Sequence, residues 1–207
     1  MTGAEALVRS LLASGVDTCF TNPGTSEMHF VAALDRVDGM RCVLALFEGV
    51  ATGAADGYAR MTGRPASTLL HLGPGLANGL ASLHNAHRAL SPIVNIVGEH
   101  GTAHRQYDPP LHSDISGLAR LYSSFVTTVE SPADAGPAAA AAVAAALAPP
   151  GRIGTVILPA DSAWTDADLR IAPPMPAPAR QRVDEARVRA AAVALRKGKA
   201  ALVLNGP

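Results

Sequence analysis

The sequence has no excess of charge of either sign, few aromatic residues and only two cysteines. Its 17 Lys and Arg residues balance 17 Asp and Glu residues, so it lacks the broad electrostatic surface that nucleic acids or anionic membranes favour. Cys19 and Cys42 stand in apolar stretches without CxxC spacing, which indicates buried free thiols rather than a disulfide framework or a zinc site. These absences predict a cytoplasmic protein whose partner is a small molecule.

Long apolar runs are missing as well. The longest uncharged stretch, Ala135 to Gly151, is rich in alanine and too short to cross a bilayer comfortably. The N-terminus shows no basic region followed by an apolar run, so we expect neither an export signal nor a membrane partner. A hydrophobic content of 48% over 207 residues nevertheless allows a substantial core, enough for one domain and part of another.

Short β-rich runs alternate with segments long enough to form helices. The first helix is expected to begin at a capping box formed by Thr2 and Glu5 and to end at Gly15. The expected strands are Thr18–Thr21, Arg41–Phe47, Ser67–His71, Ile93–Val97, Phe125–Val129 and Thr155–Leu158. This pattern predicts an α/β fold with a mostly parallel sheet and helices on both faces. Such sheets bind ligands outside the carboxyl ends of their strands.

The composition changes after the sixth expected strand. We predict one domain over residues 1–165, a proline-rich linker over 166–183 and the beginning of a second, truncated α/β domain over 184–207. The second unit would contain a helix at Ala186–Lys197 and a strand at Ala200–Leu204. Because one helix and one strand cannot bury their apolar faces alone, we expect the sequence to be a fragment of a longer protein.

Glu48 is the leading candidate for chemistry because it lies at the junction of an expected strand and helix. Apolar surroundings disfavour a charged carboxylate and a helix N-terminus favours it, and this competition suits a group that shares protons. Taken alone, such a Glu more often only complements the helix dipole. Gly49, Gly53 and Gly57 then leave one helix face bare, so we expect tight packing there, for example against the same helix of a second subunit.

Two glycine-rich turns and a histidine complete the candidate site. Asn22-Pro23-Gly24 follows the first expected strand, and Gly73-Pro74-Gly75 follows the third. Either tripeptide alone is typical of a turn. His71 ends the third strand and could move protons near neutral pH, although a lone histidine more often has a structural role. The remaining histidines, with Glu99, show no complete metal-ligand signature, so no metal ligand is expected.

Three blocks of the sequence resemble the aminopyrimidine-binding domain of thiamin diphosphate enzymes of the acetolactate synthase and benzoylformate decarboxylase group. Glu48–Arg60 is similar to the segment that begins with the family's cofactor-activating Glu, and Gly15–Gly24 resembles the upstream loop. Leu70–Gly79, followed by Leu83–Ala86, matches the family's glycine-rich loop and helix. The resemblance covers about residues 1–165 and implies the thiamin diphosphate-binding fold.

The resemblance also implies a role for each matching position. Glu48 would hydrogen-bond the aminopyrimidine ring and so promote proton removal from the thiazolium carbon. Other residues would line the aminopyrimidine end of the pocket: Asn22, Pro23, Gly24, Gly75 and Asn78. Thr25 and His71 fall where benzoylformate decarboxylase-like members carry a hydroxyl residue and a histidine near the substrate, so both are expected to be catalytic.

The implied activity is the decarboxylation or carboligation of a small 2-oxo acid, whose identity stays open. Pro110-Leu111 stand where acetolactate synthases usually carry Phe-Gln, and Leu46-Phe47 replace their Arg-His, so decarboxylation is slightly favoured. The family binds Mg²⁺ and the diphosphate through a C-terminal Gly-Asp-Gly signature that does not occur here. The segment alone is therefore expected to be inactive, and FAD binding stays open.

The resemblance further implies a homodimer or homotetramer, which we expect to assemble through the helix Glu48–Arg60. Two alternatives remain. One is the small subunit of a split thiamin diphosphate decarboxylase, and the other is a non-catalytic nucleotide-binding module. A module without catalysis would have no need for a carboxylate at position 48.

Overall fold

The centre of the molecule is a six-stranded parallel sheet with the strand order β2-β1-β3-β4-β6-β5. The computed structural model describes residues 1–180 and 182–198. The strands are β1 Thr18–Asn22, β2 Arg41–Leu44, β3 Ala66–Leu70, β4 Ile93–Glu99, β5 Phe125–Thr128 and β6 Ile153–Pro159. The predicted α/β fold with a parallel sheet is confirmed.

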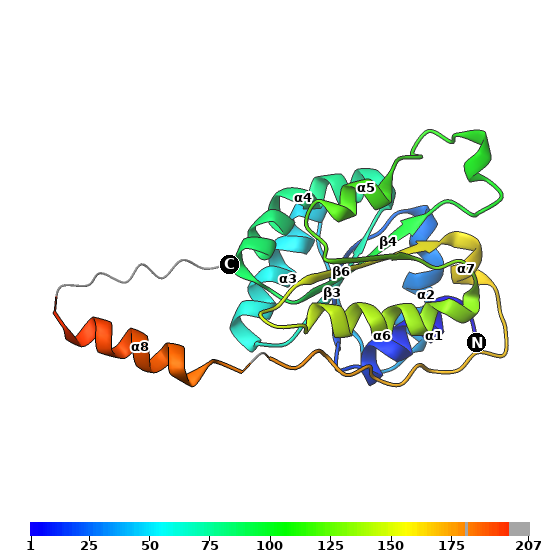
Figure 1. Ribbon diagram of the computed structural model, residues 1–207. Coiled ribbons are helices and arrows are strands. Elements are labelled where there is room, and N and C mark those ends of the chain that lie inside the picture. The colour runs from blue at the N-terminus through cyan, green and yellow to red at the C-terminus, as the bar shows by residue number, and fades with distance from the viewer. Residues whose placement is uncertain (181, 199–207) are drawn as a thin grey trace.

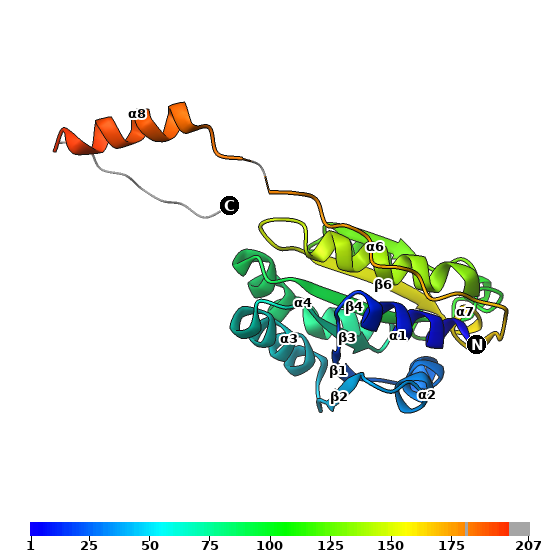
Figure 2. The ribbon, with the colours of Figure 1, turned by 90° about the horizontal axis from the view of Figure 1, so that it is seen from below.

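Helices cover both faces of the sheet, as Figures 1 and 2 show. The first face carries α1 Gly3–Ala13, α2 Met28–Arg36 and α6 Ala135–Ala146, and the second carries α3 Glu48–Thr62, α4 Leu72–Ala89 and α5 Ile115–Arg120. The short α7 Ala160–Trp164 follows β6, and α8 Glu185–Arg196 comes last. Three 3₁₀ turns lie in loops: η1 Thr25–Glu27, η2 Arg105–Tyr107 and η3 Pro132–Asp134.

Each face of the sheet contributes its own apolar core. Leu7 and Leu11 of α1 pack with Val94 of β4 on one side, whereas Leu76 and Leu83 of α4 belong to the cluster on the other. Every residue of β4 and β6 is buried. Central parallel strands covered on both faces have this property, and it explains why these segments are nearly continuous apolar runs in the sequence.

The first helix begins as its sequence predicts. The Thr2 hydroxyl accepts a hydrogen bond from the Glu5 amide at 3.2 Å, and the Glu5 carboxylate accepts one from the Thr2 amide at 3.2 Å. Gly15 follows the helix with φ of 84°, a left-handed conformation that favours glycine. Local side-chain chemistry therefore sets both ends of α1.

The second strand is shorter than expected, because β2 ends at Leu44 and not at Phe47. The Ala45 amide still donates to Thr21 of β1 at 2.8 Å, but the Ala45 carbonyl accepts from the Asn22 side chain at 2.8 Å. Leu46 is 92% exposed, so the apolar composition of this segment does not reflect a buried strand. The hydrogen bond from Asn22, the last residue of β1, thus takes the Ala45 carbonyl just after the end of β2.

The segment after residue 165 runs along the outside of the domain before α8, which projects away from it (Figure 1). The N-terminal amine pairs with Asp166 at 2.8 Å, and the Ala172 amide donates to the Ser10 hydroxyl at 3.0 Å. None of the residues in α8 is buried. The expected strand at Ala200–Leu204 lies outside the described residues, so the division into domains stays a prediction.

No helix within residues 1–180 and 182–198 combines the length and apolar character that crossing a membrane requires.

Candidate functional site

The candidate residues gather at the carboxyl ends of three neighbouring strands. The first strand ends at Asn22, the second leads into Glu48, and the third is followed by His71, which caps α4. Because β2, β1 and β3 are adjacent and parallel, the segments that follow them meet at one edge of the sheet. The topology therefore brings together side chains that are far apart in the sequence.

Glu48 is the first residue of α3 and is only 8% exposed. Its Oε2 atom accepts a hydrogen bond from the side-chain amide of Asn78 in α4 at 3.0 Å. The unpaired backbone N–H groups of the first helical turn favour negative charge at this position. The carboxylate is therefore held in place by α4 and electrostatically supported by α3.

Gly75 gives the Glu48 carboxylate the space that it occupies. A Cβ at position 75 would lie 3.0 Å from Glu48 Oε1 and 3.3 Å from the His71 Cβ, closer than side chains normally pack. Gly75 thus leaves Glu48 Oε1 facing bare backbone. Of the expected cofactor-binding residues, Gly75 and Asn78 are therefore the two that touch Glu48 directly.

The bare face of α3 is occupied in part by α4 of the same chain. A Cβ at Gly49 would lie 3.3 Å from the Asn78 carbonyl oxygen, and one at Gly53 would lie 3.4 Å from the Ser82 hydroxyl. The Ser82 hydroxyl donates to the Gly49 carbonyl at 2.9 Å. Gly57 faces open space, with nothing within 4 Å of its ideal Cβ. Packing of this helix against a second subunit stays a prediction.

The Asn22-Pro23-Gly24 segment has a structural task in addition to its expected contact with the cofactor. Its asparagine holds the Ala45 carbonyl at 2.8 Å and so fixes the path of the chain towards Glu48. Gly24 lies against the His71 ring, where a Cβ would overlap the imidazole. The turn therefore connects the surroundings of Glu48 with those of His71.

His71 is paired with Glu27, a residue that the sequence analysis did not single out. The Nδ1 atom of His71 lies 2.7 Å from Oε2 of Glu27, whose side chain is 1% exposed. The other oxygen, Oε1, is buried without a hydrogen-bond partner in the described part of the chain. Such an unsatisfied acceptor typically costs roughly 1–3 kcal/mol. The only hint in the sequence was a carboxylate at the end of the loop that follows β1.

The residue after His71 is held in a strained backbone conformation. Leu72 has φ of 51° and is buried. A non-glycine residue in this region costs on the order of 1–3 kcal/mol and persists only where its surroundings hold it, as often happens at functional sites. The strain lies at the sharp turn from β3 into α4, which sets the position of His71.

Thr25 lies apart from the Glu48 contacts. It is exposed and lines a cavity of about 240 Å³ together with His29, His100, His104 and Trp164. The rings of His100 and His104 pack edge to face, with centroids 5.7 Å apart. The expected catalytic role of Thr25 therefore stays a prediction that no direct contact with Glu48 or His71 supports.

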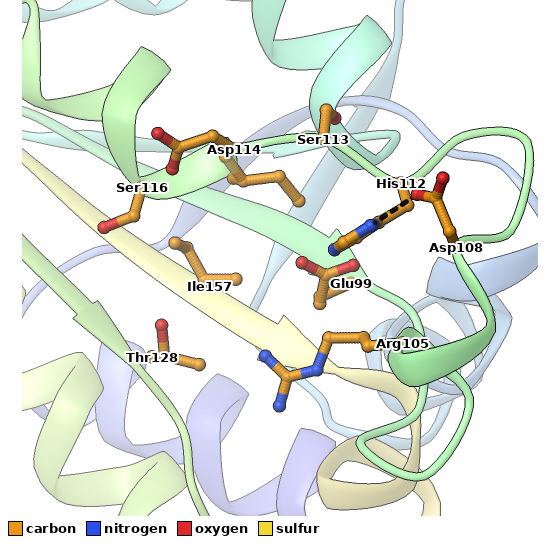
Figure 3. A pocket seen from close by; sticks show the side chains of 10 residues that line it. Glu99, Arg105, Asp108, His112, Ser113, Asp114, Ser116, Thr128 and Ile157 are labelled. Atoms are coloured by element: carbon orange, nitrogen blue, oxygen red, sulfur yellow. Dashed lines mark hydrogen bonds and ion pairs between the residues drawn. The ribbon is translucent and has the colours of Figure 1, made fainter.

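A larger cavity of about 520 Å³ opens at the carboxyl ends of β4, β5 and β6. Figure 3 shows Glu99, Arg105 and His112 around it. His112 Nδ1 lies 3.0 Å from the Asp108 carboxylate. Strand β4 contributes to both surroundings, because Glu99 lines the cavity and the preceding Gly98 lies with its backbone against Glu27. Its charged groups of both signs suit a polar ligand.

Comparison with known protein families identifies the family of this domain. Residues 1–123 match the family described as thiamine pyrophosphate enzyme, N-terminal TPP binding domain. The chain belongs to this family. As the sequence resemblance predicted, it contains the cofactor-binding N-terminal domain found in enzymes of the acetolactate synthase and benzoylformate decarboxylase group.

Named members of the thiamine pyrophosphate enzymes support this assignment. The chain is 54% identical over 206 residues to a Mycobacterium tuberculosis protein provisionally named acetolactate synthase large subunit IlvX, and it spans 39% of that protein. It is 41% identical over 85 residues to the benzoylformate decarboxylase of Pseudomonas aeruginosa, a match that covers 41% of this chain and 16% of that enzyme.

A solved structure of the same family has the same fold. The thiamine diphosphate-dependent 4-hydroxybenzoylformate decarboxylase of Rhodococcus jostii RHA1 superimposes with a TM-score of 0.79 at 25% identity, covering 95% of this chain and 38% of that one. The chain thus spans about two fifths of the length of these full-length relatives.

Proposed function

We propose that this chain is the aminopyrimidine-binding part of a thiamin diphosphate-dependent enzyme that acts on a small 2-oxo acid, with decarboxylation slightly ahead of carboligation. The observation that carries the proposal is the Glu48 carboxylate. It is buried at a helix N-terminus, held by Asn78 on one oxygen and left facing bare backbone at Gly75 on the other. This arrangement suits a carboxylate that hydrogen-bonds a ring nitrogen of a flat heterocycle.

The residues fit the aminopyrimidine end of the cofactor. Gly24 and Gly75 let the His71 ring and the Glu48 carboxylate lie directly against backbone, and Asn22 and Pro23 precede Gly24 in the same half-buried turn. This close backbone approach fixes the two side chains that would face the aminopyrimidine ring. When bound, thiamin diphosphate supplies the electron sink that decarboxylation of a 2-oxo acid requires.

The task of the protein is to orient the ring and to manage protons. Glu48 would share a proton with the ring nitrogen through Oε1, while Asn78 keeps the carboxylate from rotating by occupying Oε2 at 3.0 Å. His71 and Thr25 are proposed to act near the substrate. His71 is suited to proton transfer because one nitrogen of a neutral imidazole donates a hydrogen bond while the other accepts one.

The remaining assignments are also proposals. We infer that residues 1–165 form the cofactor domain and that residues 166–183 link it to a second domain beginning at 184, because none of the residues in α8 is buried. Mg²⁺ and the diphosphate would be bound by another part of the enzyme, since the family's Gly-Asp-Gly signature is absent from this sequence. Cys19 and Cys42 are both free thiols, which favours a cytoplasmic location. Cys19 is buried as expected, whereas Cys42 is exposed, so the expectation of a buried thiol at position 42 was wrong.

A homodimer or homotetramer is proposed to form through the helix that runs from Glu48 to Arg60. Val50 on this helix is 58% exposed, and Met61, which follows Arg60, is 86% exposed. Gly57 lies between these two residues in the sequence, and nothing lies within 4 Å of its ideal Cβ position. Apolar side chains beside a bare backbone offer a surface that a second subunit could bury.

The test of the proposal is Glu48→Gln in the complete enzyme. The amide keeps the shape of the side chain but cannot share a proton in the same way, so turnover should fall by about 10² to 10⁴. Glu130→Gln, which changes an exposed glutamate, is the matched control and should leave turnover unchanged. Near-normal turnover by folded Glu48→Gln would remove Glu48 from the mechanism, whereas a complete protein without turnover in its unmodified form would favour a non-catalytic module.

A further inference from the structure

Glu27 is a buried carboxylate that the proposed mechanism does not yet use. We propose that Glu27 is a positioning residue that fixes the protonation pattern of His71, so that His71 exchanges protons with the substrate through Nε2. This inference rests on the proposed function, because it assigns a role to His71 within the same site.

The hydrogen bonds around Glu27 identify the proton on His71. Two groups converge on Oε2: the Gly24 amide donates at 2.8 Å, and His71 Nδ1 lies 2.7 Å away. An ionised carboxylate accepts hydrogen bonds and does not donate them, so the proposal assigns the proton between Glu27 and His71 to Nδ1. A neutral imidazole with its proton on Nδ1 carries its lone pair on Nε2. The second nitrogen is then free to take a proton from another group.

The backbone is shaped to accommodate this carboxylate. A Cβ at Gly98 in β4 would overlap the Glu27 carboxylate, and a Cβ at Gly24 would overlap the His71 ring. Strand β4 and the turn after β1 thus approach the pair through backbone that carries no side chain at these two points. Such close approach makes the separation of the two groups insensitive to side-chain motion.

The charge balance of the pair also favours a role in proton transfer. Within residues 1–180 and 182–198, no lysine or arginine forms an ion pair with Glu27, and His71 is its one basic partner. When Nε2 accepts a proton, the imidazole gains one positive charge, which the adjacent carboxylate stabilises. When Nε2 releases the proton, the imidazole becomes neutral again and the pair carries only the negative charge of Glu27.

The experiment is a double-mutant cycle in the complete enzyme, comparing Glu27→Gln, His71→Ala and the double variant. Glu27→Gln should lower kcat by about 10- to 100-fold, the loss typical when the carboxylate behind a metal-bound histidine is removed. In the His71→Ala background the same change should alter kcat by less than about twofold, because interacting residues are not additive. If the free-energy loss of the double variant equals the sum of the losses of the two single variants, the proposal is overturned and Glu27 has a structural role only.

A second measurement does not depend on turnover. Long-range ¹H–¹⁵N spectra of histidine-labelled protein should show His71 protonated at Nδ1, and Glu27→Gln should produce a mixture of tautomers. An Nε2-protonated His71 in the unmodified protein would contradict the assignment.

Gly98→Ala offers a matched perturbation that leaves both side chains in place. Its Cβ must displace the Glu27 carboxylate, whereas the control Gly101→Ala adds a Cβ whose nearest neighbour is 3.9 Å away. Folded Gly98→Ala should reproduce the kinetic loss of Glu27→Gln, and Gly101→Ala should not. Failure of the proposed function would show up separately, as full activity in Glu48→Gln.

Discussion

Adding a single methyl group at Gly75 should disturb the reactive carboxylate while leaving the fold intact. The Cβ of Gly75→Ala would lie 3.0 Å from Glu48 Oε1, 3.4 Å from Glu48 Cγ and 3.3 Å from His71 Cβ. Ordinary contacts need a few tenths of an ångström more, so the Glu48 side chain must move away by about that distance. A misplacement of 1 Å can cost roughly 10² in rate, so we expect kcat to fall by about 10-fold.

The effect of Gly75→Ala on stability should be small by comparison. Alanine is favoured over glycine inside a helix by about 1 kcal/mol, and crowding in a packed interior costs roughly 1–3 kcal/mol, so the two effects largely offset one another. The matched control is Gly53→Ala, which also lies where α3 meets α4. Its Cβ would lie 3.4 Å from the Ser82 hydroxyl and 3.8 Å from the Ser82 Cβ, which are ordinary contacts, so it should leave kcat unchanged and raise stability slightly.

The assay combines steady-state kinetics of the complete enzyme with thermal denaturation of both variants. A change of 1 kcal/mol corresponds to about 2–4 °C in Tm for a domain of this size. Full activity in Gly75→Ala would show that the space at Glu48 is not required. An equal loss of kcat in Gly53→Ala would show that any added methyl group between α3 and α4 impairs activity. The effect of Gly75→Ala could then not be attributed to its contact with Glu48.

Three further changes test neighbouring features. Asn78→Asp places a second carboxylate about 3.0 Å from Glu48, so like-charge repulsion should weaken cofactor binding at least about 10-fold in a fluorescence titration; unchanged affinity would contradict the Asn78 contact. Burial raises the pKa of the Cys19 thiol to about 12, so alkylation followed by mass spectrometry should modify Cys42 first and Cys19 only after unfolding. Met61→Lys should dissociate the proposed oligomer in sedimentation experiments, and an unchanged assembly would place the interface elsewhere.

Much of the architecture follows from local information in the sequence. The capping box at Thr2 and Glu5 and the left-handed Gly15 mark the two ends of α1 through contacts within a few residues. The buried strands β4 and β6 are mostly apolar because both of their faces are covered. The place of Glu48 at a strand-to-helix junction is local in the same sense, which is why the sequence alone identified it.

Other features required the assembled sheet. Strand β2 ends just before Ala45, whose carbonyl accepts a hydrogen bond from the Asn22 side chain, so an apolar run continuing to Phe47 was misleading. The pairing of Glu27 with His71 joins residues 44 positions apart and exists only because β1 and β3 are neighbours in the strand order. Composition and periodicity describe one segment at a time. They predicted which segments end at the site, and only the order of the strands decided which side chains meet there.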